Sequence, residues 1–197
     1  MHTRSSHRIA AIAVGLMLAL SACGADTKDS NGLKANADGT SKSDASSSNQ
    51  QMSQLPKTPL EQSTKTSAAL SAIETALKQE GGTAFEIEQA DAGWEVHVLK
   101  DKRAVTVIVD PAGASVVGTR RDERVSRGLA EALEETRIPL SRAITVAAKR
   151  VSGDLDDAEL DTGRHQNMWV VTLVDKKVET DVFIDISNGL ILRYDRD

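Results

Sequence analysis

The sequence has few of the residues that most catalytic and nucleic-acid-binding proteins use. With one cysteine in 197 residues, no intramolecular disulfide can form. Aromatic residues make up 3%, which is too few for a platform that stacks single-stranded bases. The net charge is −5, and it is about −7 without the first 22 residues, which carry Arg4 and Arg8. No basic block is present, so nucleic acid is excluded as a partner.

Catalytic motifs are also missing. Of the four histidines, His2 and His7 lie in the first 22 residues, which leaves His97 and His165. Neither has the spacing of a catalytic triad or a zinc site. There is no G-x-S-x-G, no C-x-x-C and no phosphate-binding glycine loop. The sequence therefore predicts a protein that is not an enzyme and needs no cofactor.

The N-terminus has the layout of a secretory signal, with two arginines before the apolar run Ile9–Leu20. That run is too short for a membrane-spanning helix. It ends in Leu20-Ser21-Ala22-Cys23, which resembles the lipobox of bacterial lipoproteins. The resemblance implies cleavage between Ala22 and Cys23 and acyl chains, palmitate among them, linked to Cys23. The mature protein would then be anchored on the extracytoplasmic face of the cell membrane. An ordinary signal peptide followed by a free thiol is the alternative.

After the signal (residues 1–22), residues 23–57 are rich in Ser, Asp, Asn, Lys and Gly, and their few apolar residues show no period. Such a segment buries too little apolar surface to offset its conformational entropy. We expect a disordered tether that begins at the lipidated cysteine.

Two stretches of equal length repeat. Trp94–Asp110 and Trp169–Asp185 both open on Trp and close on Asp, and five of their seventeen residues are identical. Apolar residues alternate in both, with a Lys-containing turn in the middle, which is typical of a half-buried hairpin. The alternation predicts that both Trp side chains lie in the core, although an exposed Trp would be a good binding residue.

A helix precedes each repeat. Thr58, Pro59 and Glu61 have the pattern of an N-cap, first helical residue and capping box, and the first helix is expected over about residues 59–80. Ser141 is the expected cap of the second helix, which would end by Gly153. A connecting helix is expected over residues 123–138.

The sequence thus predicts an α+β fold with two repeated units, residues 58–122 and 139–197. In each, a helix would pack on a three- to four-stranded antiparallel sheet. Each unit resembles a PepSY domain. The resemblance depends on the helices "ALSAIETALKQEGG" and "RAITVAAKRVSG", followed by Trp, alternating Val, a turn and a closing Asp. It implies a binding protein whose partner is a peptidase, which it would inhibit or regulate, or another envelope protein. It brings no catalytic residues.

Two sets of residues are candidate sites. The outward side chains of the repeats would bind a protein partner, and they include Glu95, His97, Thr172, Glu179 and Asp181. The run "DLDDAELD" contains Asp154, Asp156 and Asp157, which are weak candidates for a metal site, since the run fails the EF-hand pattern. The alternative for this run is a charged edge strand with Leu155, Ala158 and Leu160 inward. A small-ligand or cation-binding lipoprotein is accordingly the second functional hypothesis.

Overall fold

The computed structural model describes residues 58–163 and 166–197. The predicted signal, Cys23 and tether therefore lie outside the described residues, as does His165. Within the described residues, eight strands form one antiparallel sheet in the order β4-β3-β2-β1-β5-β6-β7-β8. Their bounds are β1 Thr83–Ala90, β2 Gly93–Lys100, β3 Arg103–Val109, β4 Val116–Arg124, β5 Asp154–Thr162, β6 Asn167–Asp175, β7 Val178–Asp185 and β8 Ile191–Arg196.

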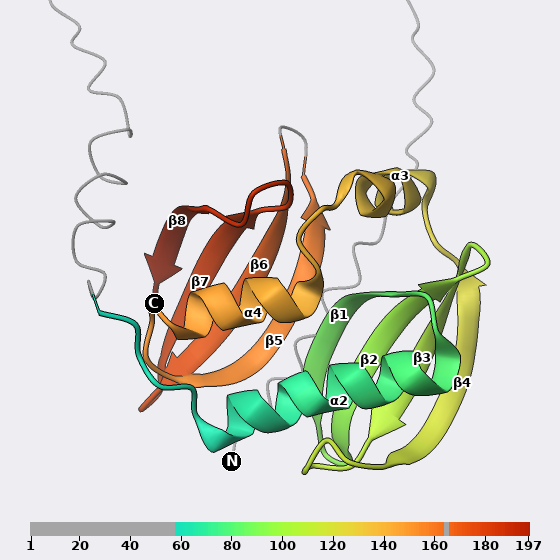
Figure 1. The fold of residues 1–197 in the computed structure, drawn as a ribbon, viewed down its shortest axis with the longest axis horizontal. Coiled ribbons are helices and arrows are strands. Elements are labelled where there is room, and N and C mark those ends of the chain that lie inside the picture. Colours follow the sequence, from blue (N-terminus) through green and yellow to red (C-terminus); the bar gives the residue numbers. More distant parts are fainter. Residues whose placement is uncertain (1–57, 164–165) are drawn as a thin grey trace, which may run out of the picture. The chain divides into compact units, whose positions relative to one another are not determined.

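Two helix-plus-strand units form this α+β fold, as predicted (Figure 1). Each unit contributes four strands, and the units join where β1 pairs antiparallel with β5. The edge-strand prediction for residues 154–161 is wrong, because β5 lies between β1 and β6 in the interior of the sheet. Its inward residues are as predicted, since Leu155, Ala158 and Leu160 are all buried.

The helices are α2 Thr64–Glu80, α3 Arg127–Glu135 and α4 Leu140–Ala148. α2 and α4 lie across the same face of the sheet (Figure 1). α3 joins the same core through Ala132 and Leu133. It is shorter than predicted because β4 continues to Arg124 and Ser126 caps the helix, accepting from the Leu129 amide at 3.1 Å. Among the described residues, no helix is both long and apolar enough to span a bilayer.

Both predicted N-caps are wrong. Ser63, not Thr58, caps α2: its hydroxyl accepts from the Thr66 amide at 3.1 Å. Before it, the Leu60 amide donates to the Lys149 carbonyl at 2.9 Å, which ties the preceding segment to the end of α4 rather than to α2. α4 begins after Pro139, which provides no side-chain cap, and Ser141 lies inside the helix.

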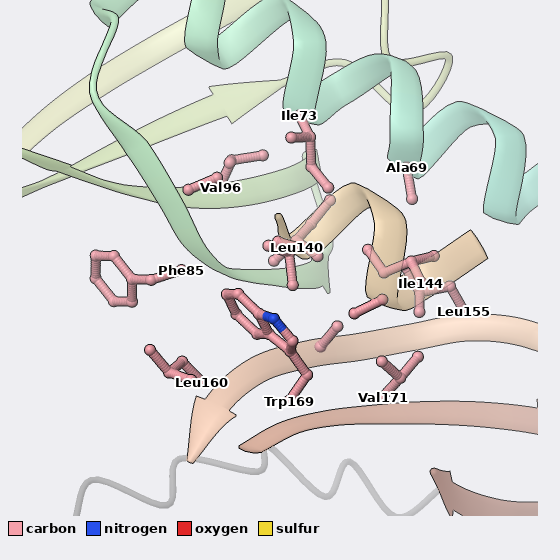
Figure 2. Packing of buried hydrophobic residues seen from close by; sticks show 14 of the residues in the cluster. Ala69, Ile73, Phe85, Val96, Leu140, Ile144, Leu155, Leu160, Trp169 and Val171 are labelled. Atoms are coloured by element: carbon pink, nitrogen blue, oxygen red, sulfur yellow. The ribbon is translucent and has the colours of Figure 1, made fainter. Parts of the chain in front are cut away.

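The core lies between the two helices and the sheet. Side chains from α2, α4 and strands of both units meet there, and Figure 2 labels ten of them. Trp94 and Trp169 are 2% and 0% exposed, so the prediction that both are core residues is confirmed. Each indole N–H has a partner: Trp94 donates to the Pro111 carbonyl at 3.3 Å and Trp169 to the Ile138 carbonyl at 2.8 Å.

The repeated turns keep the same geometry in both units. The residue pairs at the β2–β3 and β6–β7 turns, Asp101-Lys102 and Lys176-Lys177, all have positive φ, as two-residue hairpins require. The closing acids of the repeats, Asp110 and Asp185, accept backbone hydrogen bonds from the turns that follow them. What the two copies share is therefore the residues that build the scaffold.

Candidate functional site

The face of the sheet opposite α2 and α4 is here called the open face, since no described helix lies across it (Figure 1). Cross-strand pairing places its side chains in two rows that run through all eight strands. In strand order, the first row is Gly118, Ile108, Glu95, Glu88, Asp157, Thr172, Asp181 and Asp195. The second is Arg120, Thr106, His97, Glu86, Glu159, Val170, Phe183 and Arg193.

Carboxylates gather where the two units meet. Glu88 lies directly opposite both Glu95 and Asp157, and Glu86 lies opposite Glu159. We call these five residues the acidic joint. Like charges that face each other across a sheet destabilise it. At the border of the joint, Arg120 Nη2 lies 3.9 Å from Glu95 Oε2.

The crowding changes the acidity of the joint. Burial, followed by the charges of Glu159, Glu88 and Glu95, raises the pKa of Glu86 to about 7. Burial and the charge of Glu159 also raise the pKa of Asp157 to about 7, against a hydrogen bond from Thr172 that lowers it. Two carboxyl groups with pKa values raised to about 7 therefore lie diagonally from each other on the neighbouring strands β1 and β5.

His97 borders the acidic joint on β2. Its Nδ1 lies 3.2 Å from Thr106 Oγ1, and its ring centroid lies 6.0 Å from that of Phe85. Burial lowers the pKa of His97, against the charges of Glu88, Asp122 and Glu95. Its Nε2 is buried and has no hydrogen-bond partner among the described residues. The ring is thus held in place while one nitrogen stays unused.

The five predicted partner-binding residues all belong to the open face, in two separate places. Glu95 and His97 lie at the acidic joint. Thr172 and Asp181 lie opposite each other on β6 and β7, and the Thr172 hydroxyl donates to Asp181 Oδ1 at 2.9 Å. Glu179 is exposed nearby on β7. Thr172 itself is buried.

The predicted metal candidates differ in their surroundings. Asp154 and Asp156 are exposed on β5, whereas Asp157 is half-buried in the acidic joint. Among residues 58–163 and 166–197, the acids and histidine close enough to share an ion are Glu88, Glu95 and His97. Their ligand atoms all lie within 4.8 Å of one another.

Sequence reasoning missed Glu86, Glu88 and Glu159 as members of a site. Their alternation with apolar residues in "FEIEQ" and "DAEL" is visible in the sequence. What the sequence does not display is that these two strands pair. A shallow hollow of about 370 Å³ lies elsewhere, near Leu60, Ala148 and Lys176, and includes none of the acidic joint.

Comparisons with known proteins give a family for part of the chain. The PepSY family, described as "Peptidase propeptide and YPEB domain", matches residues 137–195. No curated protein matches the sequence. A candidate lipoprotein of Clostridium difficile 630 is similar in structure, with 16% identity, a TM-score of 0.41, and coverage of 64% of this chain and 90% of that one.

A BLIP-like protein of Bacteroides fragilis NCTC 9343 is also similar in structure, with 15% identity and a TM-score of 0.25. That match covers 64% of this chain and 84% of the other. The family match covers the second unit, and the assignment of the first unit to the same family stays a prediction. The matched residues 137–195 contain α4, strands β5 to β7 and most of β8, and over this range the chain is similar to the PepSY family.

Proposed function

We propose that the protein is a non-enzymatic, membrane-anchored lipoprotein of the cell envelope. Its open face would bind a protein partner, a peptidase, and regulate it. In this proposal the chain is divided as predicted into a signal (residues 1–22), a tether (23–57), two units (58–122 and 139–197) and a connecting segment (123–138). Cys23 would carry the anchor on the extracytoplasmic face of the membrane.

The observation that carries the proposal is the acidic joint. Facing carboxylates destabilise a sheet, so a sequence selected for stability alone would not gather five of them at a strand joint. A partner with basic side chains would pair with them and relieve the repulsion. At the β6–β8 end of the face, the Arg193 guanidinium lies 3.4 Å from the centroid of the Phe183 ring. Phe183 is buried, so this end offers the Arg193 cation as a contact beside the acidic one.

The choice of a peptidase as partner depends on the PepSY match, whose family description names peptidase propeptides. A propeptide-like domain binds the peptidase without itself being a catalyst. The predicted contact residues Glu95, His97, Thr172, Glu179 and Asp181 would then surround the acidic joint and set specificity, because the two units differ at these positions.

The proposal is tested with the full-length protein and the envelope peptidases of its own organism. Complex formation and peptide hydrolysis would be measured for the native chain and for Glu88→Gln with Asp157→Asn. Each lost carboxylate is expected to weaken binding by about tenfold, and added salt to weaken it further. The matched control, Glu74→Gln with Glu134→Gln, removes two exposed carboxylates from α2 and α3. Equal binding by both double variants, or no binding by the native chain, would contradict the proposal.

A further inference from the structure

Three side chains on the open face have the composition of a metal site. Glu88 lies on β1 directly opposite Glu95 on β2, and His97 follows Glu95 by two residues on the same face. One carboxylate oxygen from each glutamate and one ring nitrogen of His97 lie within 4.8 Å of one another, and all three residues are half-buried. Two atoms bound at about 2 Å to one ion lie at most about 4 Å apart, so small side-chain rotations would bring these three atoms onto an ion.

The hydrogen bonds around His97 decide which nitrogen is available. The Thr106 hydroxyl donates its one proton to Asp122 Oδ2 and also accepts from Arg120 Nη2 at 3.3 Å. Because that proton is already used, His97 Nδ1 must donate to Thr106 Oγ1 across their 3.2 Å contact. The neutral ring then carries its lone pair on Nε2.

His97 Nε2 is the atom that has no hydrogen-bond partner among the described residues, although it is buried. A buried lone pair without a donor is unfavourable. Histidines that bind metals commonly donate their other ring N–H to an oxygen that fixes the tautomer, and the Thr106 hydroxyl, which donates to Asp122, supplies such an oxygen here. The hydrogen bond between His97 and Thr106 does not involve the two glutamates, and it leaves the Nε2 lone pair of His97 available to a metal ion.

We propose that Glu88, Glu95 and His97 bind a divalent transition-metal ion, of which zinc is the representative. One imidazole with two carboxylates suits such an ion, whereas calcium and magnesium favour sets made only of oxygen ligands. Three protein ligands leave one tetrahedral position for water or another group. The two glutamate charges balance the ion and remove the repulsion between Glu88 and Glu95. The site goes beyond the proposed function, and neither requires the other.

The test is calorimetry with zinc chloride on the mature chain, residues 23–197, stripped with a chelator and carrying Cys23→Ser to remove its one thiol. We expect one ion per chain. Glu88→Gln and His97→Gln should each weaken binding by more than about tenfold, and Thr106→Val should weaken it by about tenfold through the freed ring. His165→Gln is the matched control for the second histidine of the mature chain, and Asp154→Asn is the control for the acidic run.

The outcomes are distinct. Zinc binding that Glu88→Gln weakens and both controls leave unchanged supports the site. If no heat of binding is seen with zinc up to 1 mM, the dissociation constant is weaker than about a millimolar, and the proposal is overturned. Binding that only Asp154→Asn or His165→Gln weakens, or binding of calcium in place of zinc, also overturns it. If His97→Gln does not fold, which circular dichroism would show, Glu88→Gln decides, since it keeps the shape of the side chain. Because Glu88 belongs to both sites, the test with peptidases is made with chelator present, and its result is then independent of zinc.

Discussion

Replacement of Asp157 by asparagine should make the protein more stable, and only at higher pH. The aspartate lies in the acidic joint, with Glu88 opposite it on β1 and Thr172 opposite it on β6. Burial, then the charges of Glu159, Asp156 and Asp181, raises its pKa from 3.8 to about 7, against the hydrogen bond from Thr172. The folded protein therefore holds this proton more tightly than the unfolded chain does.

The sign follows from that difference. Below pH 3.8 the carboxyl is protonated in both states and has no effect on stability. Between pH 3.8 and about 7 the unfolded chain releases the proton first, so the free energy of unfolding falls as pH rises. Above about pH 7 Asp157 is ionised in both states, and the protein carries the full destabilisation that its ionisation causes. The difference between the two pKa values corresponds to about 4 kcal/mol for a fully buried group. We expect about half of that because Asp157 is half-buried.

The variant removes the ionisable group and keeps its shape. Asp157→Asn should therefore unfold like the native protein at pH 4 and be more stable by about 2 kcal/mol at pH 8. The midpoint of thermal unfolding at pH 8 should rise by about 4–8 °C. Asp154→Asn, on the same strand but exposed, is the control and should change little at either pH. Denaturant unfolding with chelator present measures both. A variant that is equally stable at pH 4 and pH 8, or less stable at pH 8, would refute the reasoning.

Three further changes have expected results. Gly113→Ala should destabilise the protein by about 2 kcal/mol or more in denaturant unfolding, because the new Cβ would lie 2.1 Å from the Ala68 carbonyl oxygen at a φ of 76°. Gly128→Ala on α3, where nothing lies within 4 Å, should be neutral or stabilising, and an equal loss in both variants would contradict this account. Cys23→Ser should release the protein from membranes or leave its precursor uncleaved in cell fractionation, and a processed, membrane-bound variant would disprove the anchor. The affinity for the partner should rise from pH 6 to pH 8 as the acidic joint ionises, and a binding titration at the two pH values measures it. A lower affinity at pH 8 would contradict this prediction.

The scaffold could be predicted from the sequence because its signals are local. Trp94 and Trp169 head strands with strict alternation, and that period of two gives burial on one face without any knowledge of the partner strand. Helix starts were less accurate. The Thr58 pattern fits a capping box, yet Ser63 caps the helix, and the deciding contact is a backbone hydrogen bond to Lys149 in the other unit.

The acidic joint could not be predicted because it depends on pairing between distant strands. β1 and β5 are more than sixty residues apart, and their register brings Glu88 opposite Asp157. Irregularities at Phe85 and Asp156 also shift the alternation by one residue. Such a bulge exchanges the faces of the residues before and after it. Asp157 therefore lies on the open face with Glu159, although Leu155, two residues before it, is in the core.

The central claim is that the open face, and not the helix face, meets a peptidase. A photo-crosslinking amino acid placed at Asp195, exposed on the open-face row at β8, tests it directly in the living cell. The same amino acid at Glu74, exposed on α2, samples the helix face. We predict a crosslink to an envelope peptidase from position 195 and none from position 74. Crosslinking of that peptidase from position 74 alone, or equally from both positions, would contradict the account.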